Sequence, residues 1–380
     1  MSEPELPARV ARFLTQPESA DFEGLALAAF RFQRSQIPPY GALATRRGFA
    51  TSDPPDWRSI PMVPTAAWKT LELAAAPAIE TFRSSGTGGE RSVHHHGFPD
   101  LYRAVIDASF PRFCLPAGLS RLPILSLVPE RAVLPDSSLA FMIAHVLERF
   151  GTPAGAGPGS LASATALGAR GVELGKVRSW LNAAQRGGKP VLIIATAFAL
   201  VELLDTLTRI DLHFRLPAGS AVFETGGFKG KTREISRDEL LALTENRLGL
   251  APQAVVREYG MTELTSQCYT RALAGGDPDL FVAPHWMRMR VLDPATLEEA
   301  APGAPGLLAL FDLANLSSAV HVLTEDLGVQ DGEGFRLVGR AAGAELRGCS
   351  LAAEEIVREA GKPAGYSDKA GKPAGHSHGA

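Results

Sequence analysis

Short apolar runs that alternate with helical patterns are the feature that most restricts the fold of this sequence. The runs with the length and composition of strands are residues 79–82, 123–128, 190–195, 221–223, 255–258 and 307–311. Apolar residues with helical spacing occur between them, in residues 137–150 and in the stretch that ends at Leu207. Strands that alternate with helices in this way predict an α/β protein whose sheets are covered by helices.

Composition argues against several classes of protein. The formal net charge is only −3 over 380 residues and the basic residues are scattered, so we expect no nucleic-acid partner. Three cysteines that lie far apart do not make a disulfide framework or a zinc motif. The longest apolar run, residues 191–203, is too short to span a membrane, and the N-terminus lacks an apolar secretory segment. We therefore expect a soluble, cytoplasmic protein.

We predict four segments along the chain. Residues 1–60 form an N-terminal segment packed on the main domain, helical up to residue 35 and loop-like in the proline-rich stretch 36–64. Residues 61–340 form the main domain, and 341–360 a short C-terminal segment. Residues 361–380 are expected to be disordered, because AGKPAG is repeated there and apolar periodicity is absent.

Two glycine-rich turns follow predicted strands. Residues 84–89 read SSGTGG, in which bare backbone can approach a phosphate while hydroxyls and amides donate hydrogen bonds. The spacing is neither that of a Walker A loop nor that of a dinucleotide fingerprint. Residues 224–230 read ETGGFKG, in which two adjacent glycines let a flat ring lie against the backbone. The alternative for residues 84–89 is a plain glycine-rich turn, and for residues 224–230 it is a hairpin or loop turn in which Lys229 is solvated.

Three further motifs carry polar chemistry. In residues 258–263 (EYGMTE) an aromatic ring can stack on a base, a hydroxyl can hold a phosphate and a carboxylate can hold Mg²⁺. In residues 324–328 (TEDLG) a carboxylate can accept hydrogen bonds from both hydroxyls of a ribose. Residues 335–340 (FRLVGR) end the set.

The order of these five motifs resembles the adenylate-forming superfamily of acyl-CoA synthetases, peptide-synthetase adenylation domains and luciferases. More narrowly, it resembles the acyl-protein synthetases (LuxE type) of bacterial fatty-acid reductase complexes. That narrow resemblance includes DSSL at 136–139 and RGCSL at 347–351, and it covers roughly residues 60–355. It implies an α/β fold, the large N-terminal domain of an adenylate-forming synthetase with helix-covered sheets, followed by a C-terminal small domain truncated to a stub.

The resemblance also implies ATP and Mg²⁺ as cofactors and assigns residues to them. Those residues are Ser84, Ser85, Gly86, Thr87, Gly88 and Gly89 for the β- and γ-phosphates, Gly226, Gly227 and Tyr259 for adenine, Thr262 for the α-phosphate, Glu263 for Mg²⁺, and Asp326 and Arg340 for the ribose.

The sequence departs from the superfamily pattern at two places. Glu90 and Arg91 stand where the superfamily has Pro-Lys, so Arg91 is either a phosphate contact or a solvated side chain. The superfamily's C-terminal domain also carries a lysine that assists adenylation, and no matching motif follows Arg340. Our hypothesis is that Lys229, within the second glycine-rich motif, supplies that positive charge.

Cys349 is the candidate acyl acceptor. It precedes Ser350, the expected N-cap of a helix over residues 351–359, and both a helix N-terminus and nearby Arg347 favour a thiolate. A small buried cysteine at a helix start is the alternative. The resemblance independently places an acyl-accepting cysteine in this Gly-Cys-Ser segment.

The remaining cysteines and His145 are expected to be structural. Cys114 and Cys268 are predicted to lie in the core, and so is His145, within an apolar helix. The run of three histidines at 94–96 is not expected to bind a metal, because consecutive side chains point in different directions. Contact with the phosphate loop or with solvent is expected instead.

The resulting functional prediction is activation of a carboxylic acid, a fatty acid by resemblance, to an acyl-AMP and transfer of the acyl group to a thiol. A reductase or another carrier protein would then receive it. One alternative is an acyl-CoA or aryl-CoA ligase of the phenylacetate type, in which coenzyme A replaces Cys349 as acceptor. The other is a catalytically silent nucleotide-binding subunit of a complex.

Overall fold

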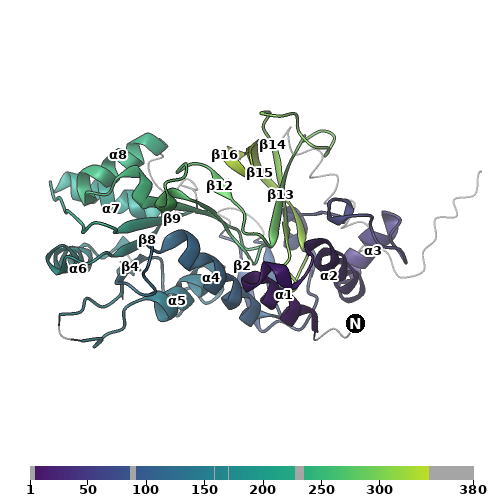
Figure 1. The fold of residues 1–380 in the computed structure, drawn as a ribbon, viewed down its shortest axis with the longest axis horizontal. Coiled ribbons are helices and arrows are strands. Elements are labelled where there is room, and N and C mark those ends of the chain that lie inside the picture. Colours follow the sequence, from purple (N-terminus) through teal and green to yellow (C-terminus); the bar gives the residue numbers. More distant parts are fainter. Residues whose placement is uncertain (1–4, 86–90, 158, 170, 227–234, 342–380) are drawn as a thin grey trace, which may run out of the picture.

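The computed structural model describes residues 5–85, 91–157, 159–169, 171–226 and 235–341, in which helices surround one large sheet (Figure 1). The helices are α1 (Glu5–Thr15), α2 (Phe22–Gln36), α3 (Pro38–Arg46), α4 (Pro99–Cys114), α5 (Ser138–Phe150), α6 (Leu174–Gly187), α7 (Ala197–Arg209) and α8 (Arg237–Leu248). None of these helices has the length and apolar character that a membrane span requires.

The strands are β1 (Val63–Pro64), β2 (Glu80–Arg83), β3 (Val93–His96), β4 (Ile124–Leu127), β5 (Ala164–Thr165), β6 (Leu167–Gly168), β7 (Gly171–Val172), β8 (Leu192–Thr196), β9 (Ala221–Thr225), β10 (Val255–Tyr259), β11 (Cys268–Thr270), β12 (Phe281–Val282), β13 (Met287–Leu292), β14 (Gly306–Asp312), β15 (His321–Asp331) and β16 (Gly334–Arg340). The main sheet of the described chain runs β13-β14-β15-β16-β12-β11-β10-β9-β8-β4-β5, with β1 beside β15. The pairs β2–β3 and β6–β7 form separate hairpins.

One half of the main sheet is parallel and is covered by helices on both faces. Strands β5, β4, β8, β9 and β10 pair in parallel, and their nearly continuous apolar sequences are typical of strands buried on both sides. Helices α6, α7 and α8 pack on one face, while α4 and α5 pack on the other (Figure 1). The carboxyl ends of β8, β9 and β10 lie side by side, with Thr196, Thr225 and Glu258 in register. Ligands of open α/β sheets bind at this edge.

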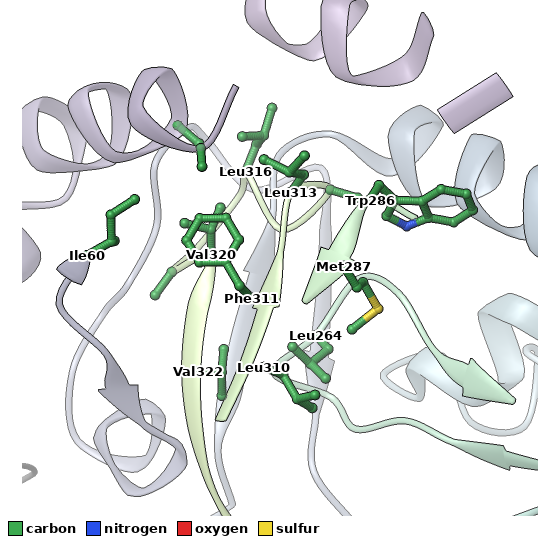
Figure 2. Close-up of a cluster of buried hydrophobic side chains, with 14 of the residues drawn as sticks. Ile60, Leu264, Trp286, Met287, Leu310, Phe311, Leu313, Leu316, Val320 and Val322 are labelled. Atoms are coloured by element: carbon green, nitrogen blue, oxygen red, sulfur yellow. The ribbon is translucent and has the colours of Figure 1, made fainter. Parts of the chain in front are cut away.

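The other half of the sheet is antiparallel except for the short strand β1, which pairs in parallel with β15, and it shares its core with the N-terminal helices. Figure 2 shows part of this cluster, in which Phe311 of β14 lies near Val320 and Leu310 lies near Leu264. Helix α2 contributes a polar side chain as well: Gln33 is fully buried, its amide donates to the Asn315 carbonyl at 2.9 Å and to the Ser318 carbonyl, and its oxygen accepts from the Val320 amide at 3.0 Å. The loop 312–320 is therefore held from outside the sheet.

The predicted α/β class is confirmed, as are the predicted strands and the helices over 137–150 and up to Leu207. Helices α2, α5, α7 and α8 begin with a capping side chain that accepts a hydrogen bond from a backbone amide in the first turn. The capping residues are Asp21, Ser137, Thr196 and Ser236.

Part of the loop predicted for residues 36–64 is wrong, because residues 38–46 form helix α3. Pro38 and Pro39 occupy its first turn, where a missing N–H costs no hydrogen bond and the fixed φ suits a helix. The strand β3 and the antiparallel strands β13, β15 and β16 were not predicted. The C-terminal segment and tail lie outside the described residues, and the segment boundaries remain predictions.

Candidate active site

Strand β9 ends at the glycine motif predicted to hold adenine. Gly226 has φ of +74°, a conformation that favours glycine, and a Cβ placed there would meet no atom of the described residues within 4 Å. The backbone is therefore bare and open at this point of the carboxyl edge. Gly227 and Lys229 lie outside the described residues, and their assignments remain predictions.

Three of the predicted nucleotide-binding residues form one hydrogen-bonded group. The Tyr259 hydroxyl donates to Asp326 Oδ2 at 2.8 Å, and Arg340 Nε donates to Asp326 Oδ1 at 3.1 Å. Strand pairing sets this arrangement, because Asp326 of β15 and Arg340 of β16 are register partners. Burial, followed by the nearby Asp326 charge, raises the pKa of Tyr259 well above its ordinary value, so the hydroxyl stays a donor. Each carboxylate oxygen retains a lone pair for a further donor.

Thr262 and Glu263 lie on the loop between β10 and β11, and this loop is anchored in the core. Its backbone is held from the loop 312–320: Asp312 accepts from the Thr265 amide at 3.0 Å and the Ser266 amide at 2.7 Å, and Asn315 Nδ2 donates to the Glu263 carbonyl at 2.8 Å. Leu264 is buried in the cluster of Figure 2. A buried loop needs such side-chain partners for its backbone polar groups.

Asp312 and Asn315 were missed as supports of the site. Asp312 directly follows the predicted strand 307–311, but nothing in the local sequence indicates which loop its carboxylate contacts. Burial raises the pKa of Asp312, although the hydrogen bonds from Ser266, Ala314 and Thr265 oppose that shift.

Glu263 offers a buried carboxylate to the site. Its side chain accepts a hydrogen bond from the Ser92 hydroxyl, and the residue is 7% exposed. No cluster of three or more histidine, cysteine or acidic residues capable of holding a metal occurs among the described residues. A single carboxylate nevertheless fits Mg²⁺, which keeps several waters and takes further oxygens from the phosphates of a bound nucleotide.

The phosphate loop has a defined base. Ser84 and Ser92 close it, because the Ser84 amide donates to the Ser92 carbonyl and the Ser92 amide donates to Ser84 Oγ, each at 3.0 Å. Arg91 reinforces this base by donating to the carbonyls of Ser84 and Arg83 and by pairing with Asp136 at 3.2 Å. Its guanidinium therefore holds the loop base, which neither of its two predicted roles anticipated. Residues 86–89 lie outside the described residues.

The histidine run forms strand β3 rather than a loop or helix start. The expectation of solvent contact is wrong for His94 and His96, which are 0% and 1% exposed, while contact with residues 86–89 remains a prediction because these lie outside the described residues. Their rings face the loop between β10 and β11: His94 Nδ1 contacts the Thr262 carbonyl at 2.5 Å, and His96 Nε2 lies 3.1 Å from Thr265 Oγ1. Burial lowers the pKa of His94 to about 4, so its ring is neutral at pH 7.

One further carboxyl lies at the carboxyl edge without having been singled out from the sequence. Glu258 accepts a hydrogen bond from the Thr225 hydroxyl across the β9–β10 pair. Burial raises its pKa to about 7. Because successive side chains alternate in a strand, Glu258 lies on the opposite face of β10 from Tyr259.

The core predictions for two cysteines are confirmed. Cys114 and Cys268 are buried at 0% exposure, and burial raises the pKa of each thiol. His145 is partly buried and hydrogen-bonded to Asp107 at 3.0 Å, which fits a structural role. Cys349 lies outside the described residues, and its assignment remains a prediction.

The fold is that of adenylate-forming ligases. It is similar to an open conformation of 2-hydroxyisobutyryl-CoA ligase in complex with 2-HIB-AMP and CoA, with a TM-score of 0.58 and 18% identity, covering 83% of this chain and 73% of that one. It is equally similar to the postadenylation state of 2-hydroxyisobutyryl-CoA ligase in complex with R3-HIB-AMP, with a TM-score of 0.59 and 16% identity over 83% of this chain and 66% of that one.

Sequence comparison specifies the family within this class. Residues 171–357 match the family model of acyl-protein synthetase, LuxE. It is also 21% identical, over 308 residues, to the long-chain-fatty-acid–luciferin-component ligase of Vibrio harveyi, covering 78% of each chain.

Proposed function

We propose that this protein activates a carboxylic acid with MgATP to an acyl-AMP and then transfers the acyl group to its own Cys349. The observation that carries the proposal is the group formed by Tyr259, Asp326 and Arg340 at the sheet edge where Gly226 leaves bare backbone. A ring, a carboxylate and a guanidinium in this arrangement offer an adenosine a stacking surface and acceptors for its ribose hydroxyls. The match of residues 171–357 to the LuxE family model supports the same function.

In the first step, a carboxylate oxygen of the acid attacks the α-phosphorus of ATP, and the bond to the β-phosphate oxygen breaks to release pyrophosphate. Thr262 would donate its hydroxyl to the α-phosphate, while Ser84 and Ser85 with residues 86–89 would bind the β- and γ-phosphates. Glu263 would hold Mg²⁺, which neutralises charge on the phosphate oxygens when bound. Lys229 is proposed to add positive charge near the reacting groups.

In the second step, the Cys349 thiolate attacks the acyl carbonyl and the bond to the AMP phosphate oxygen breaks. The products are a protein thioester and AMP, and the thioester keeps the acyl group transferable. The proposed acid is a long-chain fatty acid, because the Vibrio harveyi relative is named for one. A cytoplasmic reductase or carrier protein is the proposed recipient.

Coenzyme A is the second candidate acceptor, favoured by the fold likeness to a CoA ligase. The test is acid-dependent exchange of pyrophosphate into ATP, measured with purified protein and a panel of fatty, aryl and hydroxy acids. Intact mass of the same samples then detects a covalent acyl adduct, with Cys349→Ser as the variant and Cys268→Ala, a buried cysteine, as its matched control.

Each result has one meaning. Exchange together with an adduct that Cys349→Ser abolishes and Cys268→Ala retains supports the proposal. Exchange without an adduct, followed by acyl-CoA formation when coenzyme A is added, would show that coenzyme A rather than Cys349 is the acyl acceptor. ATP binding without exchange on any acid contradicts the enzymatic proposal and favours the silent subunit.

A further inference from the structure

Strand β3 connects the phosphate loop to the loop that carries Thr262 and Glu263. It follows the phosphate loop directly and pairs with β2 on the other side of that loop, with His94 opposite Phe82. Three alternate side chains of this stretch, those of Ser92, His94 and His96, lie on one face and contact Glu263, Thr262 and Thr265 respectively. A displacement of β3 would therefore move both loops together.

The hydrogen-bond partners of His94 identify its tautomer. A carbonyl oxygen only accepts hydrogen bonds, so the Nδ1 atom that contacts the Thr262 carbonyl must carry the hydrogen. Because burial keeps the ring neutral, Nε2 then holds a lone pair. Within the described residues this buried Nε2 has no hydrogen-bond partner.

The neighbouring His96 differs in this respect. Its Nε2 lies 3.1 Å from the Thr265 hydroxyl and its Nδ1 lies 3.4 Å from the Ser317 hydroxyl, so both ring nitrogens have partners. An unpartnered buried acceptor such as His94 Nε2 is destabilising. An apolar side chain at position 94 would therefore make the folded protein more stable. Only a polar side chain, however, can make the hydrogen bond that His94 Nδ1 makes to Thr262.

We propose that His94 is a positioning residue for adenylation, whose Nδ1–H fixes the Thr262 carbonyl and so orients the Thr262 hydroxyl toward the α-phosphate of bound ATP. This inference rests on the proposed role of Thr262. The Thr262 backbone lies between two fixed points, the His94 contact and the Asn315 hydrogen bond to the next carbonyl, that of Glu263. Loss of the first contact frees the residue that must be aligned with the reacting phosphate.

Three substitutions separate this role from a packing role. His94→Asn keeps an amide N–H near the position of Nδ1, whereas His94→Gln carries its N–H further out, near Nε2, and His94→Leu removes both polar atoms. We expect His94→Asn to keep the maximal exchange rate within about threefold, and His94→Gln and His94→Leu to lose about ten- to hundredfold, the effect of a small misalignment at a reacting group. The KM for ATP should change by less than about threefold in all three variants.

Stability and spectroscopy provide readouts that activity does not. Because His94→Leu removes an unpartnered acceptor, its Tm is expected to equal or exceed that of the wild-type protein while its exchange rate falls. Nitrogen-15 chemical shifts of the His94 ring are expected to show hydrogen on Nδ1. His95→Leu is the control, because this side chain lies on the other face of β3 near Thr81, and exchange should be unchanged.

Three results would overturn the inference and leave the proposed function intact. They are full exchange activity in His94→Leu, losses of exchange activity that parallel the losses of Tm across the three variants, and a His94 tautomer with hydrogen on Nε2. Absence of exchange in the wild-type protein with every acid would overturn both this inference and the proposed function. The two failures are distinguishable because this one is seen in the unsubstituted protein.

Discussion

The Ser92 hydroxyl donates a hydrogen bond to a carboxylate oxygen of Glu263, although 171 residues separate the two in sequence. The contact joins Ser92, at the base of the predicted phosphate loop, to the carboxylate proposed to hold Mg²⁺. One oxygen of Glu263 is thereby occupied, and the orientation of the carboxylate is set by a neighbour rather than by its own rotamer alone.

Ser92→Ala should therefore raise the Mg²⁺ concentration needed for half-maximal exchange by about tenfold or more, as loss of an outer-shell partner usually does. Magnesium titration of exchange activity measures this, and calorimetric titration of MgATP checks binding directly. Ser92→Thr, which keeps the hydroxyl, is the matched control. An unchanged magnesium requirement in Ser92→Ala would contradict the assignment of Glu263.

Asp326→Asn should weaken ATP binding by about ten- to hundredfold, because hydrogen bonds to a charged acceptor contribute about 1.5–3 kcal/mol. Calorimetry with ATP, 2′-deoxy-ATP and 3′-deoxy-ATP gives the test. The wild-type protein is expected to prefer ATP over the deoxy forms, and Asp326→Asn to lose that preference. Asp331→Asn lies on the same strand and pairs with Arg336, so it should bind ATP normally. Retained discrimination in Asp326→Asn would remove Asp326 from the ribose site.

Glu258 should make the stability of the protein depend on pH. Burial raises its folded-state pKa from the ordinary 4.5 to about 7, so between these values the folded state keeps a proton that the unfolded state has released. Stability contributed by this group therefore falls as pH rises from about 4.5 to 7, by up to about 3 kcal/mol.

Glu258→Gln, which carries no titrating carboxyl, should lack this fall and gain stability relative to the wild-type protein above pH 7. Urea denaturation of both proteins at pH 4.5, 6 and 8 measures the difference. A gap between the two proteins that stays constant with pH would show that Glu258 titrates at its ordinary value.

The three thiols should differ in reactivity. Cys114 and Cys268 are buried and their pKa values are raised, so neither should form a reactive thiolate in the native protein. We expect a thiol reagent to modify one cysteine, Cys349, under native conditions and all three of the sequence after unfolding. Peptide mapping identifies the modified residue. Rapid native labelling of Cys268 would contradict the buried position of β11.

The local sequence pattern predicted the strands and helix starts that depend mainly on neighbouring residues in the sequence. Continuous apolar runs such as that of β8 indicate strands buried on both faces, and capping residues such as Ser137 mark helix starts. Pro38 led to the wrong prediction of a loop, because proline disrupts the interior of a helix but is also common in the first turn of one. The antiparallel strand β13 carries arginines at alternating positions, and β16 carries Arg336 and Arg340, so their apolar sequences are less continuous and they were harder to recognise.

In the candidate site, too, residues within recognisable motifs were predicted and residues that act on distant loops were not. Tyr259, Asp326 and Arg340 were found from motifs, and in the structure Tyr259 and Arg340 each donate a hydrogen bond to Asp326. The supporting residues were not found, because Ser92, Asp312 and Asn315 act on loops distant in sequence. Nothing in the local sequence of Asp312 indicates that its carboxylate accepts the amides of Thr265 and Ser266.

Gln33 belongs to the second helix of the chain, yet it holds the loop that in turn holds Thr265 and Glu263, and its partner Ser318 lies 285 residues further on. During synthesis on the ribosome, residues 315–320 must therefore be added before the Gln33 side chain can form these hydrogen bonds, so α2 is synthesised long before its partners. The loop that carries Thr262 and Glu263 therefore gains its full set of supporting hydrogen bonds only after residue 318 has been added to the chain.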